Sequence, residues 1–153
     1  MLKYVDAKVV FAEVPDEITL CINISGCPCN CRGCHSSYLA KDIGERLRYD
    51  NLISLIQKNR GITCVAFMGG DADPLSVNAY ASIIKEQFPN LKTAWYSGRQ
   101  ELSKDIELEN FDYIKLGPYK EEFGPLNSRT TNQRFYKVNG KELVDITNKF
   151  WKT

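Results

Sequence analysis

The sequence lacks an excess of either charge, and it lacks a long apolar run. Its 153 residues carry 20 basic and 19 acidic side chains, a net charge of +1. Proteins that bind nucleic acids or membrane surfaces usually present a basic field, so neither partner is expected. No segment approaches the length of a transmembrane helix. Acidic residues interrupt the apolar runs of the first 17 residues, unlike a signal peptide, and we therefore expect a cytoplasmic protein.

Histidine is nearly absent too, with one residue in the chain. We find neither a catalytic triad nor a pair of carboxylates at a spacing typical of acid–base catalysis. The composition, 43% hydrophobic and 25% charged, excludes a disordered chain. The length favours one compact domain spanning residues 1–153.

Cysteine, by contrast, is concentrated in one short stretch, SGCPCNCRGCH. Four of the six cysteines lie there, at Cys27, Cys29, Cys31 and Cys34. A reducing cytosol disfavours disulfides, and tightly clustered cysteines pair with one another only through strained backbone. The cluster therefore predicts metal binding.

Three of these cysteines, Cys27, Cys31 and Cys34, have the spacing C-x3-C-x2-C. Three thiolates can hold three irons of a 4Fe–4S cluster and leave the fourth iron open to a small molecule. A structural zinc site needs four ligands and would have to recruit Cys29 or His35 in a cramped run. We favour the iron–sulfur interpretation, with Cys29 as an unligated thiol.

The remaining chain alternates predicted strands and helices, which indicates parallel βαβ units. Cys21 and Cys64 fall within predicted strands, where a free cysteine behaves as a small apolar residue. A hairpin about Asn139-Gly140, with a type I′ turn, is predicted near the end. The expected strands span residues 17–25, 62–70, 91–98 and 111–118, and the expected helices span 50–61 and 76–90, the second capped by Ser76.

Each predicted strand runs into a glycine-containing turn. In open α/β sheets and barrels, the loops that follow the strands form the ligand-binding edge. Glycines recurring there allow backbone to approach a ligand. The four turns are Ser25-Gly26-Cys27, Gly69-Gly70-Asp71, Ser97-Gly98 and Gly117-Pro118.

These motifs together resemble the radical S-adenosylmethionine (radical SAM) superfamily. C-x3-C-x2-C after the first strand is its signature, and FMGGDADPL resembles its Gly-Gly motif. NSRTTNQRF, residues 127–135, resembles the region near the end of the activating enzymes of anaerobic ribonucleotide reductases. The chain departs from the superfamily pattern at Gly33, where an aromatic residue is common. The Gly-Gly-Asp-Pro motif is interrupted, so either Asp71 or Asp73 takes the role of its aspartate.

The resemblance implies an α/β fold, a partial (open) parallel βα barrel of the radical SAM type with a C-terminal β-hairpin extension. It implies a 4Fe–4S cluster and SAM as cofactors, and no catalytic side chain. The implied cluster ligands are Cys27, Cys31 and Cys34. The implied SAM-binding residues are Gly33, Cys34, His35, Gly69, Gly70, Asp71 and Ser97.

The activity implied by the resemblance is reductive cleavage of SAM to a 5′-deoxyadenosyl radical, which generates a glycyl radical on a partner. The implied partners are the large subunit of an anaerobic ribonucleotide reductase and a reduced flavodoxin- or ferredoxin-type electron donor. Three alternatives remain. They are another glycyl-radical activase, a radical SAM enzyme for a small molecule, and a non-enzymatic iron–sulfur or zinc module.

Overall fold

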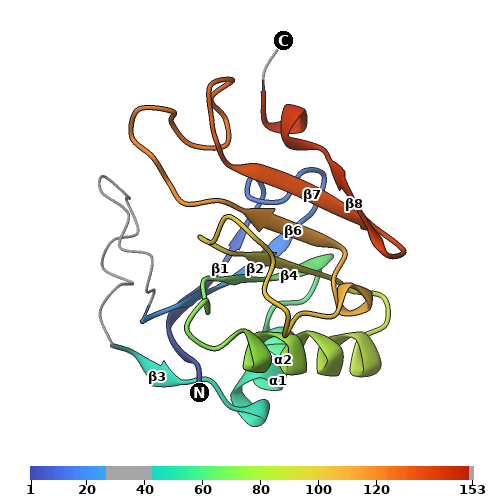
Figure 1. Ribbon diagram of the computed structural model, residues 1–153. Helices are drawn as coiled ribbons and strands as arrows, with labels where there is room; N and C mark the ends of the chain where they lie inside the picture. The colour runs from blue at the N-terminus through green and yellow to red at the C-terminus, as the bar shows by residue number, and fades with distance from the viewer. Residues whose placement is uncertain (27–42, 152–153) are drawn as a thin grey trace.

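The computed structural model of the chain describes residues 1–26 and 43–151. Among these residues, eight strands form one sheet in the order β3-β1-β2-β4-β5-β6-β7-β8 (Figure 1). The strands are β1 (Lys3–Val10), β2 (Thr19–Ile24), β3 (Glu45–Arg46), β4 (Cys64–Met68), β5 (Lys92–Tyr96), β6 (Tyr113–Leu116), β7 (Arg134–Asn139) and β8 (Glu142–Asp145). The helices of the described residues are α1 (Tyr49–Lys58), α2 (Pro74–Gln87) and the short 3₁₀ turns η2 (Leu108–Asn110) and η3 (Thr147–Phe150).

The sheet is mixed, and this corrects the predicted parallel βα barrel. Strands β2, β4, β5 and β6 are parallel to one another, as the alternating pattern predicted. On one side β1 pairs antiparallel with β2 and with β3, and on the other β6, β7 and β8 pair antiparallel. Half of the strands therefore lie outside the parallel group, and within the described residues two α-helices accompany the eight strands.

Two features of the chain explain the error. Strand β1 escaped prediction because Asp6 and Lys8 interrupt its apolar residues, and it is a half-exposed strand rather than a buried one. The connection from β5 to β6 contains the 3₁₀ turn η2 in place of a helix. A barrel of repeated βα units would need a helix there.

The sheet has a buried cluster on each face. Leu20, Ile22 and Phe67 pack with Leu52 of α1 and Ile84 of α2, so both helices cover the same face, as Figure 1 shows. The opposite cluster joins strand residues such as Cys21, Ala66 and Phe135 with side chains from loops and η3, among them Leu126 and Phe150. This second face is thus closed by irregular segments.

The boundaries of the predicted elements need two further corrections. Helix α2 begins at Pro74 and is capped by Asp73, whose carboxylate accepts from the Ser76 amide, so Ser76 is not the cap. The antiparallel β7–β8 hairpin is confirmed, but Asn139 pairs with Glu142 and the loop is Gly140-Lys141. Gly140 has φ of +65°, and Asp16 is the one described non-glycine residue with positive φ. This combination fits a type II′ turn rather than type I′.

Within residues 1–26 and 43–151, no helix is both long and apolar enough to cross a membrane.

Candidate functional site

The C-terminal ends of the four parallel strands meet at one edge of the sheet, as the glycine turns predicted. Backbone hydrogen bonds tie the turns that follow these strands. Gly69 N donates to Tyr96 O at 3.0 Å, Ser97 N to Lys115 O at 2.9 Å, and Gly117 N to Arg99 O at 2.7 Å. These backbone hydrogen bonds therefore connect the segments after β4, β5 and β6 to one another.

The predicted SAM-binding residues that the structure describes all belong to this edge. Gly69, Gly70 and Asp71 follow β4, and Ser97 follows β5. The cysteine run starts at Cys27, next in sequence to Gly26, which follows β2. The other candidates, namely Cys27, Cys29, Cys31, Gly33, Cys34 and His35, lie outside the described residues.

Gly69 and Gly70 have positive φ, and close packing explains both glycines. A Cβ on Gly70, at φ of +96°, would lie 2.6 Å from Val77 Cγ2 of α2. A Cβ on Gly69, at φ of +107°, would lie 3.1 Å from the Ile24 carbonyl oxygen at the end of β2. The Gly69 carbonyl also accepts from Trp95 Nε1 at 2.7 Å. The Gly-Gly pair therefore lets β2, β4 and α2 approach closely, whatever binds beside it.

Asp71 connects the loop after β4 to the loop after β5. Its side chain is buried. Oδ1 accepts from Ser97 Oγ at 2.5 Å, and Oδ2 accepts from the Gly98 amide at 2.8 Å. Ser97 Oγ accepts in turn from the Arg99 amide at 3.1 Å. The carboxylate thus orders three consecutive residues of the neighbouring loop.

Asp73 has a different task from Asp71. As the cap of α2 it accepts from the Ser76 amide at 3.2 Å and from Ser76 Oγ at 2.6 Å. Its carboxylate also forms an ion pair with the Met1 ammonium. Burial opposes ionisation of Asp73, but these hydrogen bonds outweigh it and hold the pKa of the carboxyl below its usual value.

Two hollows open at this edge. One, of about 480 Å³, lies beside the loops after β4 and β5 and is lined by Asp71, Pro74, Arg99, Gln100, Glu101 and Ser103. The other, of about 340 Å³, lies at the ends of β2 and β4 and is lined by Met1, Leu2, Lys3, Ser25, Gly26, Gly70, Ala72 and Asp73. The second hollow directly adjoins Gly26, the residue that precedes the cysteine run.

Sequence reasoning missed Lys115, a buried lysine on β6. Its Nζ donates to the Gly117 carbonyl at 2.8 Å and to the Ser97 carbonyl at 3.1 Å. A lysine inside the otherwise apolar run before Gly117-Pro118 was the available signal, because lysine is rarely buried. Lys115 brings a cation to the edge where Asp71 brings an anion.

Asn132 and Gln133, from the NSRTTNQRF segment, contact the loop after β6. Asn132 Nδ2 donates to the Pro118 carbonyl at 3.0 Å, and Gln133 Nε2 contacts the Gly117 carbonyl at 3.5 Å. Asn132 Oδ1 is buried and has no hydrogen-bond partner among the described residues. The NQR segment is therefore built into the same edge of the sheet as Asp71 and Lys115.

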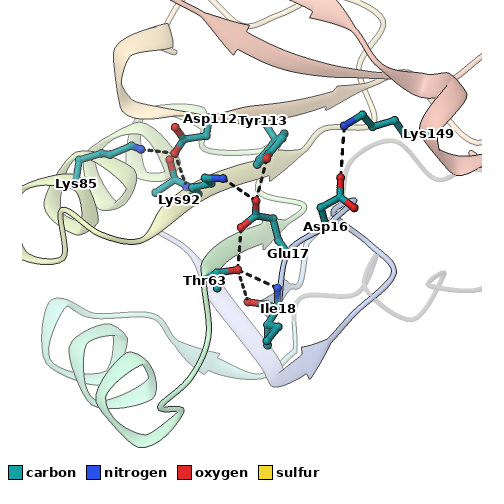
Figure 2. A network of polar contacts seen from close by, with 10 residues as sticks. Asp16, Glu17, Ile18, Thr63, Lys85, Lys92, Asp112, Tyr113 and Lys149 are labelled. Carbon is teal, nitrogen blue, oxygen red and sulfur yellow. Dashed lines mark hydrogen bonds and ion pairs between the residues drawn. The ribbon is translucent and has the colours of Figure 1, made fainter.

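The opposite ends of the parallel strands carry a polar network that the sequence did not predict (Figure 2). Buried Glu17, before β2, accepts from Thr63 Oγ1 at 2.8 Å, Lys92 Nζ at 2.8 Å and Tyr113 OH at 3.0 Å. Burial and the Glu17 carboxylate raise the pKa of Tyr113 to about 12. The hydrogen bond to Glu17 raises the pKa of Lys92. One carboxylate thus joins residues at the starts of all four strands.

The described cysteines are structural. Cys21 and Cys64 are buried in the cluster opposite the helices, as expected for small apolar residues. Burial, together with the nearby Glu13, raises the pKa of Cys21 to about 12, and burial raises that of Cys64 further. Among the described residues, no three His, Cys, Asp or Glu side chains gather to hold a metal ion.

Neither a scan against protein-family models nor searches of curated proteins and of solved structures found a match for this chain.

Proposed function

We propose that this protein is an iron–sulfur enzyme that cleaves SAM reductively and thereby generates a glycyl radical on an anaerobic ribonucleotide reductase. The C-x3-C-x2-C run carries the proposal, because it begins directly after Gly26 at the end of parallel strand β2. The edge that Gly26 shares with Gly69-Gly70-Asp71 and Ser97 is where parallel sheets bind ligands. The likeness of NSRTTNQRF to the reductase activases selects this reaction within the superfamily.

The described residues fit a small zwitterionic ligand such as SAM. The 340 Å³ hollow beside Gly26 lies within the range of about 300–1,000 Å³ typical of small-molecule pockets. Its lining includes the basic Lys3 and the acidic Asp73, and the sulfonium amino acid carries charges of both signs. Three thiolates at the C-x3-C-x2-C spacing suit a 4Fe–4S cluster with one iron open to the amino and carboxylate groups of SAM.

In this proposal the bound cluster and SAM supply the one-electron cleavage of a C–S bond, and the chain supplies binding and orientation. Cys27, Cys31 and Cys34 would hold the cluster. Gly33, His35, Gly69 and Gly70 would offer backbone or side-chain contacts to SAM beside it. An electron donor of the flavodoxin or ferredoxin type, and a cytoplasmic location, belong to the same proposal.

Anaerobic reconstitution with iron and sulfide, followed by an assay for 5′-deoxyadenosine, tests the proposal. We expect brown protein with about four irons per chain and release of 5′-deoxyadenosine from SAM in the presence of a reductant. Cys31→Ala should abolish the release. Cys29→Ala is the matched control, because it removes a thiol from the same run and should retain most of the activity.

Two outcomes would contradict the proposal. Colourless protein with one zinc per chain would support the zinc-module alternative. A cluster that forms without any cleavage of SAM would reduce the protein to an iron–sulfur module. Loss of the cluster in Cys29→Ala would instead show that the ligand assignment is wrong.

A further inference from the structure

The loop after β5 has little regular structure to hold it, although it lines the larger hollow. Residues 97–107 connect β5 to η2 without a helix. Arg99, Gln100 and Glu101 from this loop line the 480 Å³ hollow together with Asp71. Such a loop needs tertiary contacts to keep one conformation, because its backbone groups lack the ladder of a strand or helix.

Asp71 supplies those contacts at the start of the loop. Its two oxygens accept from different groups, the Ser97 hydroxyl and the Gly98 amide, in bonds of 2.5 and 2.8 Å. Hydrogen bonds to an ionised acceptor are about twice as strong as neutral ones, and both lie in a site with little access to water. The geometry fixes the carboxylate toward the backbone of the β5 loop.

The effect of Asp71 extends one strand further. Ser97 Oγ accepts from the Arg99 amide, and the Arg99 carbonyl accepts from the Gly117 amide at 2.7 Å. Lys115 Nζ then bridges the Ser97 and Gly117 carbonyls. A connected set of hydrogen bonds therefore runs from the loop after β4 through the loop after β5 to the end of β6.

We propose that Asp71 is a positioning residue, which holds the Ser97–Arg99 loop and the end of β6 in the arrangement that a ligand at this edge requires. In this assignment it acts through Ser97 and Gly98 rather than by accepting from the amino group of SAM. The part of the inference that concerns SAM rests on the proposed function. The part that concerns the loop does not.

Amide hydrogen exchange of the protein without ligand, measured by NMR, tests the loop. In Asp71→Asn, the side chain keeps its shape, but its single acceptor oxygen is neutral, so any bond that it keeps to Ser97 or Gly98 is weaker than the bond to the carboxylate. We expect exchange of the Gly98 amide to accelerate about tenfold or more. Asp50→Asn is the control, since it removes one negative charge from an exposed residue in the first turn of α1. Unchanged exchange at Gly98 in Asp71→Asn would overturn the proposal.

Binding of SAM, and of the SAM analogue that lacks the α-amino group, to the reconstituted protein separates positioning from direct contact. A positioning residue affects both ligands, so Asp71→Asn should raise both dissociation constants by the same factor, about tenfold. If Asp71 accepted from the amino group, the substitution would weaken the binding of SAM but leave the binding of the analogue unaffected. That outcome would overturn the proposal.

Ser97→Ala provides a second route, because it removes the hydroxyl but keeps the carboxylate and its bond to Gly98. A smaller rise in both dissociation constants is expected, and its effect should not fully add to that of Asp71→Asn, since both alter the same Asp71–Ser97 hydrogen bond. Fully additive effects would contradict the coupling. If Asp71→Asn does not fold, Ser97→Ala still tests whether the dissociation constants of SAM and of the analogue rise together.

The two arms can fail separately. If the wild-type protein binds neither ligand, the proposed function fails, while exchange at Gly98 still decides whether Asp71 positions the loop.

Discussion

Each end of the parallel strands has a buried carboxylate, but the two carboxylates have different hydrogen-bond partners. At the starts of the strands, Glu17 accepts hydrogen bonds from the side chains of Thr63, Lys92 and Tyr113. At the other end, Asp71 also accepts from two groups, but those groups belong to a loop that lines a hollow. A buried carboxylate surrounded by side chains closes one end, and a buried carboxylate bonded to loop backbone shapes the other.

Glycine distinguishes the two ends as well. Gly69, Gly70 and Gly117 follow the parallel strands and all have positive φ. At the strand starts the corresponding residues bear polar side chains: Thr63 and Lys92 donate to Glu17, and Asp112 accepts from the Thr93 amide. We expect substitutions at the starts to change mainly stability, and those at the ends to change mainly ligand binding.

Removing the Glu17 carboxylate should give the largest loss of stability. Glu17→Ala deletes three hydrogen bonds to a charged acceptor and leaves Tyr113 buried without its partner, at a cost of about 3 kcal/mol. Urea unfolding under anaerobic conditions measures it. The neighbouring Asp16→Asn is the control, since the Asp16–Lys149 pair at 3.4 Å is exposed and should contribute less than about 0.5 kcal/mol. Equal losses in the two variants would remove the contrast.

Gly70→Ala should destabilise the opposite end by about 2 kcal/mol, because the new Cβ meets Val77 and the backbone keeps a positive φ. Gly26→Ala is a matched variant at φ of +73°, and no atom of the described residues lies within 4 Å of where its Cβ would be. It should lose about 1 kcal/mol, from backbone strain alone. The difference between the two losses in unfolding free energy reports the steric contact with Val77 of α2. A smaller loss in Gly70→Ala than in Gly26→Ala would contradict this contact.

Alkaline pH should lower the free energy of unfolding through Tyr113, in the Glu17 network. A phenol whose pKa rises from 10.0 to about 12 on folding stabilises the fold fully below pH 10 and loses that contribution as the pH approaches 12. Cys21, raised to about 12 from 9.0, adds a loss that begins nearer pH 9. Tyr113→Phe should reduce the loss between pH 10 and 12 by up to about 1 kcal/mol, since solvent near Lys92 screens the site. An unchanged pH slope would exclude Tyr113 as its source.

The cap of α2 should give the smallest effect. Asp73→Ala removes the acceptor for the Ser76 amide and should cost between about 0.5 and 1 kcal/mol. Ser76→Ala leaves that amide bond in place and should cost less, as measured by thermal unfolding. The reverse order would restore Ser76 as the cap.

The sequence predicted the parallel strands well because their apolar runs end at glycines. Strands β2, β4, β5 and β6 all lie within predicted segments, and their turns meet at one edge as expected. It missed β1, whose Asp6 binds Asn23 and whose Lys8 is exposed, because a half-exposed strand lacks a clean apolar pattern. The barrel prediction failed with it, since antiparallel β1 occupies the outer edge of β2.

The position of the candidate site in the sheet could be predicted from the sequence, but the side-chain contacts within the site could not. Parallel strands of similar length bring Asp71 and Ser97 to the same edge, and the sequence anticipated that. The hydrogen bond between them depends on the register of β4 against β5, which pairs Met68 with Tyr96 and which no local pattern encodes. Glu17 posed the same difficulty, because its partners come from three other strands.

Glu17 also has a consequence for how the protein acquires its fold. Its partners lie 46, 75 and 96 residues further along the chain. Contacts across such distances close large loops and form slowly, so the network cannot be completed on the ribosome before Tyr113 has been synthesised. The Glu17 network before β2, the first strand of the parallel group, is therefore complete only once β6, the last, is present. Glu17 therefore acts late, and its loss should accelerate unfolding more than it slows folding.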